Sequence, residues 1–297
     1  MPSQGISLVP HGELLSYEEI LVVVRAAVEL NITRVRLTGG EPLVRSKLVD
    51  LVRMLSSTEG IDDLSLTTNG VLLRHYAPAL KKAGLKRVNI SLDSLQKDRF
   101  RYITGYDGLA EVLQGIEAAH DAGLEPVKIN TVVMRGINDT EIIDFAHLAQ
   151  EGWHVRFIEL MPNQFAVQFF NLSFISAYQV KQQLTSLGNL ESCLSSSGNG
   201  PAKYYRLPGA KGTIGFITPV SEHFCFSCNR LRLTAQGGLL PCLLSDEQID
   251  VKQPLRRGAL PDELKQLLEQ AVAAKPPGHR LAQGVIPQRR SMSQVGG

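Results

Sequence analysis

The sequence predicts an α/β fold: an incomplete, open TIM-type βα barrel followed by a smaller α+β module. Two observations support this prediction. Helix-like and strand-like segments alternate from residue 16 to residue 160 at the spacing of βα repeats. Beyond residue 160 the alternation weakens, and short strand-like runs follow a Ser/Gly/Asn-rich loop at 192–200. We therefore divide the chain into a barrel, 1–160, and a C-terminal module, 161–297.

The composition excludes several classes of protein. The chain of 297 residues carries 31 Lys and Arg against 29 Asp and Glu, a formal charge of +2. This balance, without a sustained basic block, gives no electrostatic reason to expect a nucleic acid partner. The apolar run of the first helical segment covers only 20–24, whereas a bilayer span needs about 20 residues. Residues 1–5 lack the features of a secretory signal, so we expect a cytoplasmic protein without a membrane partner.

The predicted elements begin with a helix. Ser16 and Glu19 have the spacing of a capping box, and apolar residues follow at helical spacing. Further helices are predicted at 47–57, 72–83, 109–122 and 139–150, and strands at 34–38, 64–67, 87–91, 127–133 and 155–160. Because a βα barrel begins with a strand and residues 1–15 resemble a loop, we expect the first strand to be missing and to belong before residue 1.

The predicted strands alternate polar and apolar residues, whereas a parallel strand that is buried on both faces is apolar throughout. If the apolar residues pack under the helices, the polar ones line the interior of the barrel. This polar set is Arg36, Thr38, Ser65, Thr67, Asn69, Asn89, Ser91, Lys128 and Asn130. A polar interior indicates an open barrel that holds a polar ligand, and its two basic residues favour an anion. The alternative is a polar face that is merely solvated.

Three of the four cysteines lie close together in the C-terminal module. Cys225 and Cys228 form a CxxC pair and Cys242 follows, a spacing typical of a metal site. Three thiolates leave a fourth position open, which suits a cluster iron that binds an exogenous ligand. Structural zinc closed by His223 or His279 is an equally open alternative.

Two arginines follow the CxxC pair. Arg230 and Arg232 are spaced i, i+2, so in an extended segment both guanidinium groups project from one face. Two such groups beside a metal suit a triphosphate or a carboxylate. Surface ion pairs are the alternative.

A glycine pair follows the first predicted strand. Gly39 and Gly40 lie at its carboxyl end, where barrel active sites collect, and allow a ligand to approach the backbone closely. A pair of this kind serves tight packing more often than binding. Glu41 either accepts a hydrogen bond at the barrel mouth or supplies negative charge to the start of the next helix.

These motifs resemble those of the molybdenum cofactor biosynthesis protein A family. The shared motifs are 37–43 (LTGGEPL), 66–70 (LTTNG), 89–93 (NISLD), 156–162 (RFIELMP), 225–232 (CFSCNRLR) and the terminal Gly-Gly, which together span essentially the whole chain. GGEP alone marks many radical S-adenosylmethionine (SAM) enzymes, whereas the combination with the cysteines, the arginine pair and the Gly-Gly end is specific. The resemblance implies a barrel of the radical SAM type and GTP 3',8-cyclase activity, the first step of molybdenum cofactor biosynthesis.

The resemblance also implies the chemistry. In the family, one [4Fe-4S] cluster reduces SAM to a 5'-deoxyadenosyl radical, which takes hydrogen from C3' of GTP and leads to 3',8-cyclo-7,8-dihydro-GTP. A second [4Fe-4S] cluster binds the guanine and matches Cys225, Cys228 and Cys242. Implied partners are an unidentified electron donor, a second copy of the chain in a homodimer, and the downstream cyclic pyranopterin monophosphate synthase.

Individual residues acquire roles by the same resemblance. The implied GTP ligands are Arg36, Thr67, Lys128, Arg230, Leu231 and Arg232. The implied SAM ligands are Gly40, Ser91 and Met161. The terminal Gly296 and Gly297 are implied to enter the active site, where a side chain would collide with substrate.

One family motif is not found in these 297 residues. The family's first cluster uses Cys-x3-Cys-x2-Cys after the first strand, and once three cysteines are assigned to the second cluster, Cys193 alone remains. We expect that the start was assigned too late, that the full-length protein is a cyclase with both clusters, and that the chain as given is inactive. The alternatives are a truncated, inactive GTP-binding protein with one Fe-S or zinc site, and a radical SAM enzyme that modifies a peptide.

Overall fold

An eight-stranded sheet forms the centre of the fold. The computed structural model describes residues 9–162, 167–194, 198, 200–279, 281, 285 and 286. The strands of the sheet, in chain order, are β1 (Arg34–Leu37), β2 (Asp63–Thr68), β3 (Arg87–Ser91), β4 (Lys128–Val133), β5 (His154–Glu159), β6 (Glu191–Cys193), β7 (Lys203–Arg206) and β8 (Thr213–Ile217). Their spatial order is β1-β2-β3-β4-β5-β8-β7-β6. β1 to β5 and β8 are parallel, and β7 and β6 are antiparallel.

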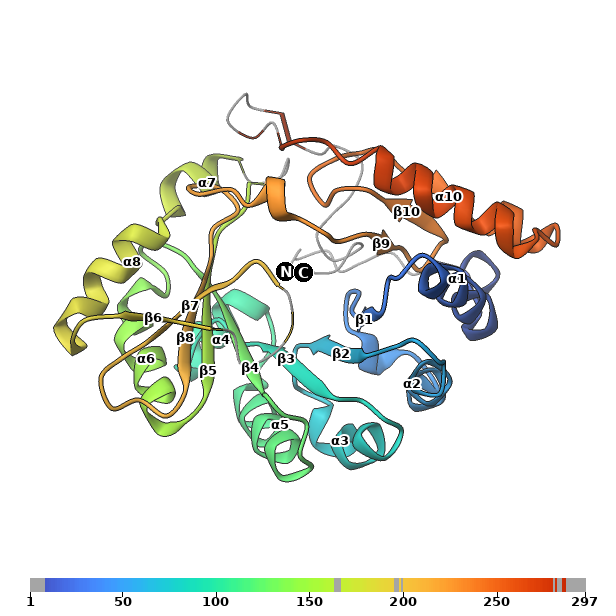
Figure 1. Cartoon of the computed structure of the whole chain (residues 1–297). Helices are drawn as coiled ribbons and strands as arrows, with labels where there is room; N and C mark the ends of the chain where they lie inside the picture. The colour runs from blue at the N-terminus through green and yellow to red at the C-terminus, as the bar shows by residue number, and fades with distance from the viewer. Residues whose placement is uncertain are drawn as a thin grey trace.

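Helices cover the outer side of the parallel strands (Figure 1). The helices of this part of the chain are, in order, α1 (Tyr17–Glu29), α2 (Leu48–Ser56), α3 (Leu73–Lys82), α4 (Lys97–Thr104), α5 (Leu109–Asp121), α6 (Ile142–Glu151), α7 (Val167–Ser173) and α8 (Ala177–Leu184). The capping box is confirmed, since the Ser16 hydroxyl accepts from the Glu19 N–H at 3.1 Å and the Glu19 carboxylate accepts from the Ser16 N–H at 2.7 Å. No helix among the described residues has the length and apolarity that a membrane crossing requires.

The apolar residues of the strands lie under these helices, as the alternation predicts. Leu64, Leu66, Val88, Ile90 and Ile129 are each at most 1% exposed and belong to one core with the inner faces of α2, α3, α5 and α6. Burial of such side chains contributes roughly 1.5–3 kcal/mol each. The open βα barrel predicted from the sequence is therefore confirmed, with β1 as its outer strand within the described residues.

The C-terminal half completes the sheet, which the sequence analysis did not predict. β8 runs parallel to β5, with Phe216 opposite Phe157, and the antiparallel hairpin of β7 and β6 extends from it. The rings of Phe157 and Phe216 lie 5.9 Å apart, and Phe145 of α6 meets Phe157 at 6.5 Å. These contacts join residues that are far apart in the sequence, so local periodicity carries no sign of them.

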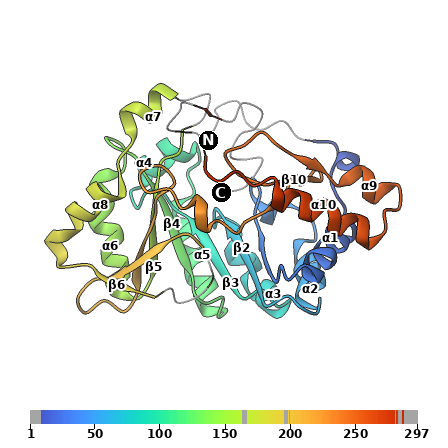
Figure 2. The ribbon, with the colours of Figure 1, turned by 45° about the horizontal axis from the view of Figure 1, so that its top comes forward.

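A second, smaller core lies at the α1 end of the barrel. Its elements are β9 (Arg232–Leu233), β10 (Gly238–Leu240), β11 (Ile249–Asp250), α9 (Lys252–Arg256) and α10 (Pro261–Ala273). The apolar side of α10 packs on Val23 and Ala26 of α1, and Figure 2 shows the two helices side by side. Arg256 strengthens this contact by donating to the Glu19 carboxylate at 3.0 Å and to the carbonyls of Gly12 and Leu14 at 2.7 and 3.0 Å.

We expect Leu268→Ala to lower the free energy of unfolding by about 2–5 kcal/mol, because this side chain is 3% exposed in the core between α1 and α10. Val272→Ala on the same helix is the control, since Val272 is 49% exposed and its loss should cost about 0.5 kcal/mol or less. Urea denaturation of both variants measures the difference. Equal losses would contradict the packing described for α10.

Candidate active site

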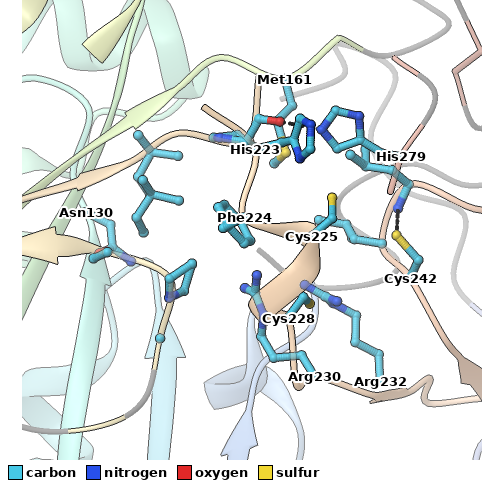
Figure 3. Close-up of a pocket in the computed structure, with 18 of the residues that line it drawn as sticks. Asn130, Met161, His223, Phe224, Cys225, Cys228, Arg230, Arg232, Cys242 and His279 are labelled. Atoms are coloured by element: carbon cyan, nitrogen blue, oxygen red, sulfur yellow. Dashed lines mark hydrogen bonds between the residues drawn. The ribbon is translucent and has the colours of Figure 1, made fainter. Parts of the chain in front are cut away.

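A cavity of about 270 Å³ lies between the inner face of the barrel strands and the cysteine-bearing segment (Figure 3). This volume approaches the lower end of typical small-molecule sites, and far exceeds the space that a lone ion needs. Sequence-predicted residues in its wall are Arg36, Thr67, Ser91, Asn130, Met161, Cys225, Cys228, Arg230, Arg232 and Cys242. The cavity therefore brings together residues from both halves of the chain.

The barrel side of the cavity is a hydrogen-bonded polar layer. Arg36 on β1 donates to the Ser65 hydroxyl at 3.4 Å, and the Asn89 amide donates to the Thr67 hydroxyl at 3.3 Å. Arg156 on β5 then donates to the Asn89 side-chain oxygen at 3.0 Å. The predicted polar interior is confirmed by these contacts.

Arg156 lines this layer but was missed by the sequence analysis. It is 5% exposed and also donates to the Tyr204 hydroxyl at 2.8 Å. The signal that identified the other polar residues was present here too, because Arg156 alternates with Val155 and Phe157. Tyr204 comes from β7, whose pairing with the barrel no local pattern indicates.

The interior carries an excess of positive charge. Burial, with the charges of neighbouring arginines, lowers the pKa of Arg36 to about 10. Burial, followed by the charges of Arg156, Arg87 and Arg36, lowers the pKa of Lys128 to about 7. Asp63 opposes both shifts, but its carboxylate is already paired with Arg87 at 2.5 Å. A polyanionic ligand would offset this charge.

A buried acceptor in the cavity wall also indicates a ligand. The Asn130 side-chain oxygen on β4 is buried and has no hydrogen-bond partner among the described residues. An unsatisfied buried acceptor costs about 1–3 kcal/mol. A ligand with a donor group at this point would remove that cost.

The three predicted metal-binding cysteines face the cavity. Cys225 begins a short 3-10 turn, Cys225–Ser227, and Cys228 and Cys242 lie beside it (Figure 3). Burial alone would raise the pKa of the Cys228 thiol, but the backbone N–H of Arg230 and the charges of Arg230 and Lys275 outweigh this effect and lower it. A lowered thiol pKa favours the thiolate that a metal requires.

The two histidines considered as zinc ligands, His223 and His279, also lie in the cavity wall. The described residues contain no group of three Cys, His, Asp or Glu side chains placed to hold one metal ion. His223 and His279 instead pack against each other, with ring centroids 5.4 Å apart, and His279 interacts with the Pro219 carbonyl at 2.6 Å. Three thiols around an open cavity leave room for a cluster, and the choice between a cluster and zinc stays a prediction.

Two arginines complete this wall. The Arg230 guanidinium lies 5.2 Å from the centre of the Phe224 ring and is close enough to Arg36 to lower the pKa of that side chain. Burial and then the charge of Arg230 lower the pKa of Arg232 to about 10. The cationic groups of the two halves thus share one site.

Other predicted site residues lie outside the cavity wall. Lys128 is fully buried beneath it, with its ammonium 5.6 Å from the centre of the Tyr204 ring. Leu231 packs against the second core, and Gly40 lies in the loop after β1. Their proposed ligand contacts stay predictions. Gly296 and Gly297 lie outside the described residues.

Glu41 has a structural role in the loop after β1. Its carboxylate accepts from the Leu43 N–H at 3.0 Å, the Thr68 hydroxyl at 2.7 Å and the Asn69 N–H at 2.7 Å. The side chain therefore joins the carboxyl ends of β1 and β2. Gly39, at φ 145°, provides the turn that brings Glu41 into this position.

Comparison with known proteins is consistent with this site. Residues 4–149 match the Radical SAM superfamily, and residues 153–281 match Molybdenum Cofactor Synthesis C. Proteins named GTP 3',8-cyclase from Pelotomaculum thermopropionicum and Moorella thermoacetica are each 51% identical to the whole chain, over 92% of their own length. This chain belongs to the GTP 3',8-cyclase family. A relative of that name from Desulforamulus reducens is 50% identical with the same coverage.

Membership of the radical SAM superfamily implies a [4Fe-4S] cluster and SAM. The cysteines of that cluster are not among these 297 residues, since Cys193 alone remains beside the three of the cavity wall. The family motif at 156–162 carries both Arg156 and Met161 of the cavity wall. Glu159 of this segment is 3% exposed. Its carboxylate accepts from the N–H groups of Ala177, Val220 and Ser221 at 2.9, 3.1 and 2.9 Å, and from the Ser221 hydroxyl. Glu159 therefore ties the barrel to the segment that leads into the CxxC pair.

We expect Glu159→Gln to lower the free energy of unfolding by about 1–3 kcal/mol, because its amide group would face N–H donors and leave some of them unpaired. Urea denaturation and hydrogen exchange of the Val220 and Ser221 amides measure the effect. Glu222→Gln is the matched control, since Glu222 forms an exposed pair with Lys203 that contributes about 0–1 kcal/mol. Unchanged exchange at Val220 in the Glu159 variant would contradict the anchoring role.

Proposed function

We propose that this protein catalyses the SAM-dependent radical cyclisation of GTP to 3',8-cyclo-7,8-dihydro-GTP, the first step of molybdenum cofactor biosynthesis. Relatives named GTP 3',8-cyclase match along the whole chain. The observation that carries the proposal is the shared cavity, in which the cationic barrel face and the thiols of the C-terminal half lie opposite each other. A nucleoside triphosphate has the matching polarity, with an anionic end and a base with donor and acceptor groups.

The proposed site residues, from the cavity wall and from outside it, divide into groups by ligand. Arg36, Arg156, Arg230 and Arg232 hold the triphosphate, with Thr67, Lys128 and Leu231 as the further GTP residues that the family motifs imply. Ser91, Met161 and Gly40 hold SAM. Cys225, Cys228 and Cys242 hold a [4Fe-4S] cluster, and Gly296 and Gly297 contribute at the substrate. When bound, SAM and the [4Fe-4S] cluster of the family's Cys-x3-Cys-x2-Cys motif would supply the radical that takes hydrogen from C3' of GTP.

Further parts of the proposal concern the molecule as a whole. We propose a division into a barrel, 1–160, and a cluster- and GTP-binding module, 161–297, with a homodimer as the assembly. The protein acts in the cytoplasm, receives electrons from a separate donor, and passes its product toward cyclic pyranopterin monophosphate synthase. The comparisons do not favour an inactive GTP-binding protein, and they give no support for inactivity of the chain as given.

Replacing Cys225 with Ser should abolish formation of 3',8-cyclo-7,8-dihydro-GTP and reduce bound iron, because one cluster ligand is removed. The assay uses anaerobically reconstituted protein with GTP, SAM and a chemical reductant, followed by mass spectrometry of the products. It is run on the 297-residue chain and on a form extended by any in-frame upstream residues.

Cys193→Ser is the matched control for this experiment. Cys193 lies in β6, outside the cavity wall, so its loss should leave product and iron unchanged. Full activity in the Cys225 variant would exclude the assigned cluster site. Zinc in place of iron in the active wild-type protein would also overturn the cluster assignment.

Binding of GTP is expected to weaken as the pH rises above about 7, because the pKa of Lys128 is lowered to about 7 in the free protein. The charge of phosphates held in the cavity above this buried ammonium raises that pKa, so in this range binding takes up a proton, and the affinity falls by at most about tenfold per pH unit. Calorimetric titration with GTP between pH 6 and 9 measures the slope. Lys128→Met should lose the part of the pH dependence that comes from this lysine, whereas the titration of GTP itself affects both proteins equally. Identical slopes in the two proteins would contradict the role of Lys128.

A further inference from the structure

Lys275 follows helix α10 and enters the wall of the cavity beside the cysteines. The helix ends at Ala273, and the side chain of Lys275 lines the cavity together with Cys228 and Cys242. The family motifs that identified the site do not include this residue. Its contacts explain why a lysine stands here.

The Lys275 ammonium joins two segments that carry cysteines. It donates to the Arg230 carbonyl at 2.8 Å and to the Pro241 carbonyl at 3.0 Å. Arg230 lies two residues after Cys228, and Pro241 immediately precedes Cys242. The same ammonium is 3.8 Å from the Cys228 sulfur. An ammonium has three donors, and these contacts account for all of them.

The hydrogen bonds of Lys275 lie beyond the end of the sheet formed by β9, β10 and β11. The antiparallel pairing of β9 with β10 joins Leu233 to Leu239 and Arg232 to Leu240 and extends no further. Cys228 and Cys242 lie past this last pair on either strand. Lys275 therefore continues the connection between the two strands with side-chain hydrogen bonds where the backbone pairing has stopped.

The position of the charge has an electrostatic consequence. Adding an electron to a cluster increases its negative charge, and a cation within a few ångströms in a half-buried site stabilises the reduced form. Hydrogen bonds to ligating sulfurs and net local charge are among the factors that set the reduction potential of such clusters. Because the Lys275 donors are engaged by protein groups, this ammonium is suited to a fixed structural position more than to capture of the substrate phosphates.

We propose that Lys275 is a positioning residue that holds the Cys228 and Cys242 segments together and raises the reduction potential of the cluster they bind. This inference rests on the proposed cluster at Cys225, Cys228 and Cys242. The positioning part is testable without the cluster, because the hydrogen bonds are formed by the protein alone.

The first measurement is hydrogen exchange of metal-free protein. Lys275→Met should make the amides of 228–232 and 238–244 exchange about tenfold faster, because the loss of two hydrogen bonds promotes local opening. Lys265→Met is the matched control: it removes the same charge from α10, where Lys265 pairs with Glu29 and Asp262, and should leave these amides unchanged. Lys275→Arg keeps charge and donors and should stay closer to wild type than Lys275→Met. Unchanged exchange in Lys275→Met would overturn the positioning role.

The second measurement is an EPR-monitored redox titration of the reconstituted full chain, with the signal that is absent in Cys225→Ser assigned to this cluster. Lys275→Met should shift its midpoint potential to more negative values, whereas Lys265→Met should not. An unchanged potential with full iron would overturn the electrostatic role, and loss of iron that Lys275→Arg restores would support the positioning role. Zinc in the wild-type site would refute the proposed cluster, while the exchange experiment would still decide the positioning role.

Discussion

The parallel pairing of β5 with β8 determines how the two halves of the cavity face each other. β8 belongs to the second half of the chain but joins the barrel sheet directly beside β5. The chain then leaves β8 at Ile217 and reaches the Cys225–Ser227 turn after a few residues. Because Glu159 at the end of β5 binds the N–H groups of Val220 and Ser221, the direction of this exit is fixed by the barrel itself. The thiols therefore lie where the inner faces of the strands end.

The interior of the barrel concentrates positive charge that the protein balances only in part. Arg87 is paired with Asp63, and Arg156 is held by neutral partners on β3 and β7. Arginine remains charged in spite of the lowered pKa values, while the buried lysine is poised to gain or lose a proton near neutral pH. Folding without the ligand thus leaves repulsion in the site, and a polyanion is the group that relieves it. The excess positive charge that makes the empty interior unfavourable is therefore also the source of its affinity for an anionic substrate.

The sequence was informative wherever a local pattern determined the structure. Strand-like runs located five parallel strands, and the alternation of polar and apolar residues placed Arg36, Thr67 and Asn130 inside the barrel. Ser16 and Glu19 fixed the start of α1 for the same reason, since a capping box is a contact between near neighbours. The spacing of the cysteines predicted a metal site, with zinc and a cluster as alternatives, and the three thiols do line one cavity.

Contacts between distant segments could not be predicted in this way. No sequence periodicity relates the residues that make these contacts. They are the pairing of β8 with β5, the hydrogen bond from Arg156 to Tyr204, and the hydrogen bonds from Lys275 to Arg230 and Pro241. Glu41 illustrates the limit well. Its position at a strand end predicted either a hydrogen-bond acceptor at the barrel mouth or a charge at a helix start, and it does both, at the start of the 3-10 turn Pro42–Val44. Its donors on the neighbouring strand, Thr68 and Asn69, could not be predicted from a local pattern.

The contact between α1 and α10 also helps to fix the position of the segment that carries the Cys225–Ser227 turn. Residues 218–231 run from β8, on one side of the open barrel, to β9, which is held through the second core to α1 on the other side. This segment therefore crosses the open side of the barrel and is attached at both of its ends. Cys225 and Cys228 lie on this segment, so their position depends on both of its attachments, to the barrel sheet and to the second core.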